Sequence, residues 1–217
     1  MFGLSPSELR ILKPLTTPRK IQHFLNQIPI NFEIKGETCL SPRKVLQQNR
    51  AHCIEGAMLA ALALRLQGYP PLLVDLTATR NDLDHVIAVF RQHGHWGAIS
   101  KTNHAVLRYR DPIYRTIREL VLSFFHEYFD TKGRKTLRSY SLPVDLTQFD
   151  SKGWMTTEKE VWPIAEHLVD VPHFSLLTRK QIAVLKQSDP IEIEVGNKTE
   201  WGHRKGKIFR KSLLSTT

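Results

Sequence analysis

The stretch from residue 54 to residue 67 limits the folds open to this chain more than any other segment. Its only strongly polar residues are Glu55, Arg65 and Gln67, and Gly68 follows as a helix stop. A helix that is apolar almost all round must be buried on nearly every side. Several alanines in the segment leave room for neighbouring elements to approach closely. We therefore predict a central helix at the heart of the core.

An antiparallel sheet is expected to cover this helix. Residues 72–77 have the composition of a strand, and residues 85–90 and 96–101 form two more apolar runs. The residues between these two runs, 92–95, have the form of a tight hairpin turn with glycine at position 94. With His93 and Gly94 in the turn, His85 lies opposite Thr102 and Ser100 is its diagonal neighbour on the same face. The predicted class is α+β.

Further helices are expected on both sides of this core. Serine or threonine followed by proline marks three helix starts, at residues 5, 17 and 41. Apolar residues at helical spacing predict a helix that begins at Asp111-Pro112 and continues to residue 128. Two more helices are predicted over residues 157–169 and 178–187.

The chain divides into four expected parts. These are an N-terminal helical extension (1–40), a core (41–140), a helical C-terminal part (141–195) and a basic tail (196–217). The net charge is +10, and the segment from Lys198 holds six basic residues and one acidic residue. A segment of this kind is most simply a solvated and mobile extension.

The apolar runs, the N-terminal residues and the number of cysteines indicate where in the cell we expect the protein. The longest apolar run, residues 57–64, is far shorter than the roughly 20 residues that a membrane span needs. The N-terminus lacks the pattern of a secretory signal, and only two cysteines are present, Cys39 and Cys53. We therefore expect a cytoplasmic protein with two free thiols.

Cys53 stands immediately before the central helix, where it could serve as a nucleophile. Unpaired backbone N–H groups and the helix dipole at this end favour a thiolate. His85 opens the second strand and supplies an imidazole that could activate the thiol. The alternative is that Cys53 is a small buried apolar residue and His85 a strand-end residue.

The segment around these residues resembles the core of the transglutaminase-like superfamily. The resemblance covers residues 43–103 and rests on Arg50-Ala51-His52-Cys53, on the alanine-rich helix ending in Gly68-Tyr69-Pro70, and on His85-Val86 before a hairpin. It implies a papain-like fold in which Cys53 is the nucleophile and His85 the base. The superfamily usually adds an aspartate on the next strand.

This sequence departs from the pattern at that third position, where it has Ser100 and Asn103. A carboxylate would orient the imidazole and stabilise its charged form, whereas a hydroxyl supplies no charge. Three explanations stay open. Ser100 or Asn103 serves as a neutral orienter, an acid such as Asp75 or Asp82 reaches in, or the site is degenerate.

An oxyanion hole needs hydrogen-bond donors close to the sulfur. The backbone N–H of Cys53 is one candidate, and the side-chain amide of Gln47 is a second by analogy with papain-like proteases. Gln47 as a plain helix-surface residue is the alternative.

The resulting hypothesis is a cysteine-dependent hydrolase or acyl transferase that acts on an amide or peptide bond through Cys53 and His85. Its partner would be a peptide or a small amide substrate, with no cofactor, no metal and no membrane. The main alternative is an inactive transglutaminase-like domain that binds a peptide or a partner. A third interpretation is a basic nucleic-acid-associated protein, because basic and aromatic residues alternate over 108–118. No nucleic-acid motif accompanies them, so nucleic acid is not the partner that we expect.

Overall fold

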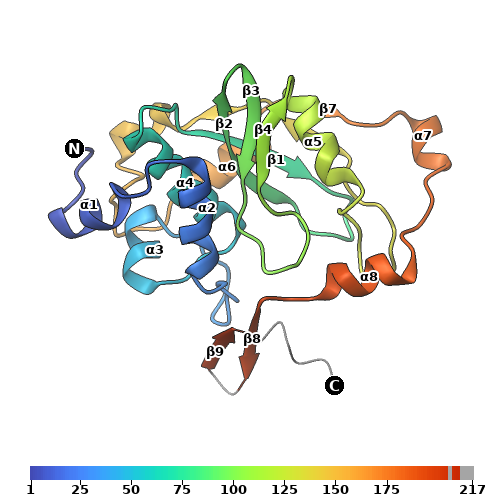
Figure 1. Ribbon diagram of the computed structural model, residues 1–217, viewed down its shortest axis with the longest axis horizontal. Coiled ribbons are helices and arrows are strands. Elements are labelled where there is room, and N and C mark those ends of the chain that lie inside the picture. The colour runs from blue at the N-terminus through green and yellow to red at the C-terminus, as the bar shows by residue number, and fades with distance from the viewer. Residues whose placement is uncertain (205–206, 211–217) are drawn as a thin grey trace.

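The computed structural model describes residues 1–204 and 207–210 as an α+β structure built on one main sheet (Figure 1). The order of strands in this sheet is β4-β3-β2-β1-β5-β7, and β6 also pairs with β1. Each of these pairings is antiparallel. In chain order the elements are α1 (Pro6–Leu12), α2 (Pro18–Gln27), α3 (Pro42–Gln48), α4 (Cys53–Leu66), β1 (Leu72–Thr77), β2 (His85–Gln92), β3 (His95–Ile99), β4 (Arg110–Tyr114), α5 (Ile117–Phe125), β5 (Ser139–Ser141), β6 (Val144–Asp145), the 3-10 helix η1 (Leu146–Lys152), α6 (Trp162–Asp170), β7 (His173–Ser175), α7 (Arg179–Ala183), α8 (Pro190–Asn197), β8 (Trp201–Arg204) and β9 (Lys207–Arg210).

The predicted central helix is α4, and every residue from Ile54 to Leu64 in it is buried. It packs with the side chains of Val86, Ala88 and Phe90 on one face of β2. The alternate residues of β2 belong to a second apolar cluster under α5, on the opposite face of the sheet. Because helices cover both faces, β2 is apolar on both sides instead of alternating with polar residues.

The register predicted for the β2–β3 hairpin is confirmed. Gln92 pairs with His95, and His93 and Gly94 have φ values of 49° and 79°. Two consecutive positive φ values are the geometry of the turn that matches the twist of two-residue hairpins. The same register brings Ser100, the residue after β3, next to His85.

The helix predicted to start at Asp111-Pro112 was placed too early. Residues 110–114 form the edge strand β4, and α5 begins at Ile117 after Thr116, whose hydroxyl accepts a hydrogen bond from the Glu119 amide at 3.1 Å. Proline is tolerated there because an edge strand has no partner on one side. The two later helices, α6 and α7, are also shorter than predicted.

Strands of the main sheet extend into the expected C-terminal parts. Residue 140 lies inside β5, and β5, β6 and β7 all join the main sheet, so the core continues beyond it. Within the expected basic tail, the strands β8 and β9 pair as a hairpin, which lies at the lower edge of Figure 1. It is anchored and not a free extension, because the Ala105 amide donates to the Lys198 carbonyl at 3.0 Å and Trp201 is buried. Residues 205–206 and 211–217 of the expected tail lie outside the described residues.

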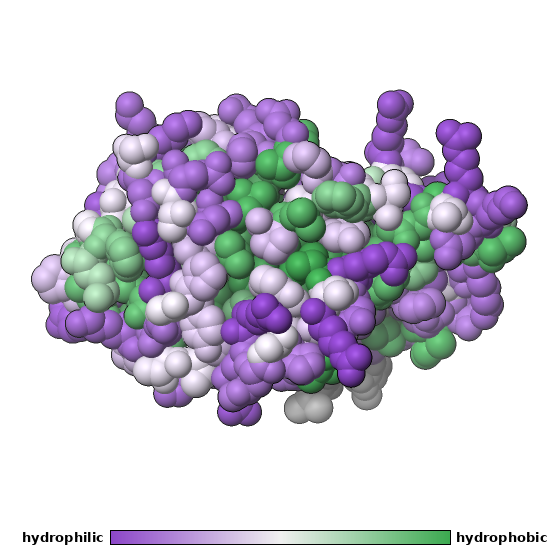
Figure 2. All heavy atoms as spheres, turned by 90° about the horizontal axis from the view of Figure 1, so that it is seen from above, coloured by the Kyte–Doolittle hydropathy of each residue, from purple (hydrophilic) through white to green (hydrophobic). Residues whose placement is uncertain are grey.

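Hydrophilic residues cover most of the face seen in Figure 2, and hydrophobic residues gather near its middle. Within residues 1–204 and 207–210, no helix has the length and apolar character required to cross a lipid bilayer.

The close packing of Lys101 against α4 gives a prediction for Gly56. A Cβ atom built on Gly56 would lie 2.4 Å from Cβ of Lys101, whose ammonium is held by the carbonyls of Leu25 and Ile28. We expect Gly56→Ala to lower the free energy of unfolding by about 1–2 kcal/mol, because overpacking outweighs the gain in helix propensity. Denaturant unfolding measures the change. If the free energy of unfolding rose by about 1 kcal/mol, as helix propensity alone predicts, the close contact between Gly56 and Lys101 would be contradicted.

Candidate active site

Cys53 and His85 line one cavity of about 420 Å³ at the end of the sheet where β2 begins. Cys53 is the first residue of α4, and His85 is the first residue of β2. Alternation along β2 places His85 on the α5 side of the strand with Ile87 and Val89. The cavity is of the size that holds a small molecule or a short peptide segment.

The sulfur of Cys53 has imidazoles on two sides. Burial disfavours the thiolate, but hydrogen bonding to His52 and His85 and the positive charge of both rings outweigh it and lower the thiol pKa to about 5. The distance between Sγ and Nδ1 of His52 is 3.9 Å. Cys39, the other free cysteine, is fully buried, and burial together with the charges of Glu55 and Glu160 raises its pKa to about 12.

The tautomer of His85 follows from its hydrogen bonds. Oγ of Ser100 lies 2.8 Å from Nε2 of His85 and 2.6 Å from the carbonyl oxygen of Leu107. A carbonyl only accepts, so the hydroxyl donates to Leu107 and must accept from Nε2–H of His85. Nδ1 is then the nitrogen left to take up a proton.

Ser100 is itself held by a residue of the N-terminal extension. The side-chain amide of Gln22, on α2, donates to the Ser100 carbonyl at 2.8 Å and accepts from the Ser100 amide at 2.9 Å. Gln22 thus makes the two hydrogen bonds that a neighbouring strand would make. The orientation of His85 therefore depends on α2 as well as on the hairpin.

The ring of His52 has a separate set of partners. Its Nε2 lies 2.8 Å from the Thr38 carbonyl oxygen, 3.4 Å from a carboxylate oxygen of Glu55 and 3.6 Å from one of Glu33. Burial disfavours the charged ring, but the hydrogen bond and the charge of Cys53, with the charge of Glu55, raise the His52 pKa to about 9.

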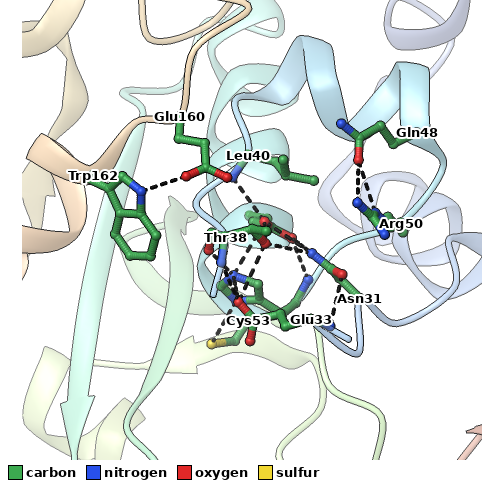
Figure 3. Close-up of polar contacts among 11 residues, drawn as sticks. Asn31, Glu33, Thr38, Leu40, Gln48, Arg50, Cys53, Glu160 and Trp162 are labelled. Carbon is green, nitrogen blue, oxygen red and sulfur yellow. Dashed lines mark hydrogen bonds and ion pairs between the residues drawn. The ribbon is translucent and has the colours of Figure 1, made fainter. Parts of the chain in front are cut away.

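Glu55 ties the start of α4 to the preceding loop. Its buried carboxylate accepts from the Leu40 amide at 2.9 Å, the His52 amide at 2.9 Å and the Thr38 hydroxyl at 2.7 Å. The amide of Asn31 adds a contact at 3.1 Å. Figure 3 shows Asn31, Glu33 and Thr38 gathered beside Cys53.

Two expected site residues have other roles in the structure. Both ends of the Asn103 amide bind the backbone of Trp201, at 2.7 and 3.1 Å, so Asn103 anchors β8 and does not orient His85. Gln47 is exposed on α3 and donates to Glu158 at 3.1 Å. It therefore supplies no oxyanion donor, and the Cys53 amide at the start of α4 remains as the candidate.

The acids considered as replacements for the missing aspartate are also engaged elsewhere. Asp75 pairs with His173 at 2.9 Å, and Asp82 accepts from the hydroxyl of Thr136 and from the Leu83 amide. Asp82 does line the cavity. The hydrogen-bond partner found for Nε2 of His85 among the described residues is the hydroxyl of Ser100.

His52, Glu55 and Gln22 are the site residues that the sequence analysis missed. The spacing of His52 and Glu55 is that of a helix cap and a third-position glutamate, a signal that was readable at the start of α4. Gln22 carried no such signal, because its contact with Ser100 spans 78 positions.

Two arginines at the start of the basic and aromatic stretch, and the nearby His104, bind other groups of the protein. Arg110 binds Glu127 at 2.6 Å, and Arg108 binds Glu200 at 3.1 Å. The ring of His104 is bonded to the Gly196 carbonyl at 2.9 Å. In the part of the chain that the structure describes, no group of three histidine, cysteine or acidic side chains is arranged to hold a metal ion.

Comparison with known proteins does not identify the chain. No protein-family model matches it, and a search of curated proteins finds no significant match.

The two free cysteines give a prediction of contrasting reactivity. We expect iodoacetamide to modify Cys53 in the folded protein from about pH 5 upward, because the sulfur is a thiolate above its lowered pKa. Cys39, with a raised pKa, should stay unmodified and acts as the internal control. Mass spectrometry of both sites over a pH series measures this. Reaction of Cys53 only near the ordinary thiol pKa of about 8.5 would contradict the prediction.

Proposed function

We propose that this chain is a cysteine-dependent hydrolase or acyl transferase that cleaves an amide or peptide bond. The observation that carries the proposal is the arrangement in one cavity of an acidified thiol, Cys53, and an imidazole, His85, whose ring is fixed by Ser100. Covalent acyl transfer requires a nucleophile next to a base, and a third group that orients the base.

The transglutaminase-like, papain-like assignment belongs to this proposal. It is supported by the cysteine at the start of a buried central helix, by the histidine at the start of the second strand, and by the antiparallel sheet that packs on the helix. We further propose a reducing compartment, the cytoplasm, as the place of action, because both thiols are free.

The proposed chemistry uses two half-reactions. In the resting protein Cys53 is a thiolate and its proton is already held at Nδ1 of His85, so the cycle begins when the sulfur forms a bond to the substrate carbonyl carbon. The C–N bond then breaks as His85 returns the proton to the departing amine, which leaves a thioester. Water or a second amine attacks the thioester while His85 accepts its proton, and the released sulfur is again a thiolate.

Ser100 sets the orientation of the base without adding charge. Because its hydroxyl donates to Leu107, it holds Nε2–H of His85 and directs the other ring nitrogen toward proton transfer. The Cys53 amide, at the positive end of α4, is the donor proposed for the oxyanion.

An activated ester that needs no knowledge of the natural substrate tests the proposal. We expect p-nitrophenyl acetate to give a burst of one nitrophenol per chain and to leave one acetyl group on Cys53, detected by mass spectrometry. Cys53→Ser should abolish the burst. His85→Ala should keep the burst and slow the turnover that follows it by about 100-fold or more, because His85 accepts the proton of the water that attacks the thioester.

The control is Cys39→Ser, which removes the buried thiol and should leave the burst intact. A folded protein that shows no acetylation of Cys53 would overturn the enzymatic proposal. The cavity would then be studied as a binding site for a peptide or partner.

A further inference from the structure

The two ring nitrogens of His52 both face hydrogen-bond acceptors. Nε2 lies 2.8 Å from a backbone carbonyl oxygen, that of Thr38, which cannot donate. Nδ1 faces the sulfur of Cys53 at 3.9 Å. A neutral imidazole carries one N–H and can satisfy only one side. With Sγ ionised, this arrangement is satisfied only when both nitrogens carry a proton.

Negative charge around the ring favours the same state. Carboxylate oxygens of Glu55 and Glu33 lie 3.4 and 3.6 Å from Nε2. Glu55 is fully buried and its hydrogen-bond donors are neutral backbone, hydroxyl and amide groups. A buried carboxylate without a cation nearby is costly, and His52 is the positive group beside it.

We propose that His52 is a catalytic residue that stays doubly protonated and acts as the fixed counter-ion of the Cys53 thiolate, while His85 carries the protons. This inference rests on the proposed function and deepens it. His52 forms and breaks no covalent bond in the cycle: it keeps both protons, and its Nδ1–H donates to the sulfur whenever the sulfur is charged.

The separate roles of His52, as counter-ion, and His85, as proton carrier, explain why a hydroxyl suffices at position 100. In a pair with one histidine, a carboxylate on the far side of the ring stabilises the charged imidazole. Here the far side of His85 meets the hydroxyl of Ser100, whereas the far side of His52 has two carboxylates. The charge expected behind one imidazole is therefore found behind the other.

The titratable groups that face His52 come from three elements. They are Glu33 from the segment before α3, Glu55 and Cys53 from α4, and His85 from β2 on the other side of the sulfur. The positive charge of His52 is retained up to a pKa of about 9, well above the pH range in which Cys53 ionises.

Alkylation of Cys53 in two single variants separates the two histidines. We expect His52→Gln to slow iodoacetamide modification at pH 6 by at least about tenfold and to move half-maximal reaction toward the ordinary thiol pKa of about 8.5. His85→Ala should keep most of the reactivity at pH 6, because the fixed counter-ion remains. His23→Gln, an exposed histidine on α2, is the matched control and should not change the profile.

The outcomes distinguish the two proposals. If His85→Ala removes the reactivity at low pH and His52→Gln leaves it, His52 is not the counter-ion, although the proposed function stands. If wild-type Cys53 shows no low-pH reactivity and is not acetylated by the ester, the proposed function itself fails.

A measurement on the unaltered protein covers the case in which His52→Gln does not fold. Nitrogen-15 NMR of labelled histidines reports the protonation of each ring nitrogen. We expect both nitrogens of His52 to be protonated at pH 7. A His52 ring with a single proton at that pH would overturn the inference.

Discussion

The carboxylate of Glu55 is the interaction on which the candidate site depends. It is buried at the third position of α4 and collects the Leu40 amide, the His52 amide and the Thr38 hydroxyl. These bonds fix the loop before α3 against the start of α4, so that the Thr38 carbonyl receives Nε2 of His52. The carboxylate of Glu55 therefore helps to direct Nδ1 of His52 toward the sulfur.

The side of the site formed by His85 and Ser100 depends on the β2–β3 hairpin and on α2. The turn at His93-Gly94 sets the register in which His85 and Ser100 become neighbours, and Gln22 then holds the Ser100 backbone. Lys101, the next residue, packs its stem against Gly56 of α4. The side with His85 and Ser100 and the side with His52 and Glu55 are therefore both held by α4, the helix that carries Cys53.

Local signals made part of this structure predictable. The apolar length of α4, the three capped N-terminal helices and the two-residue turn are written in short stretches of sequence, and the structure has each of them. The turn was enough to place Ser100 beside His85, since register in a two-residue hairpin follows from the turn itself.

Long-range contacts made the rest unpredictable. Asn103 and Gln47 have the chemistry of site residues, but their partners are Trp201 and Glu158, about a hundred positions away. The first residues of the helical spacing that begins at Asp111 form the strand β4, because β3 pairs with them. Pattern alone does not show which of two local structures a tertiary partner will select.

The central claim is that the sulfur of Cys53 is ionised in the resting protein. Ultraviolet absorbance of the thiolate, followed against pH in Cys39→Ser with Cys53→Ser as the blank, tests it without any reagent. The account predicts the signal of one thiolate per chain at pH 7, lost as the pH falls through about 5. A signal that appears only near the ordinary thiol pKa of about 8.5 would contradict it.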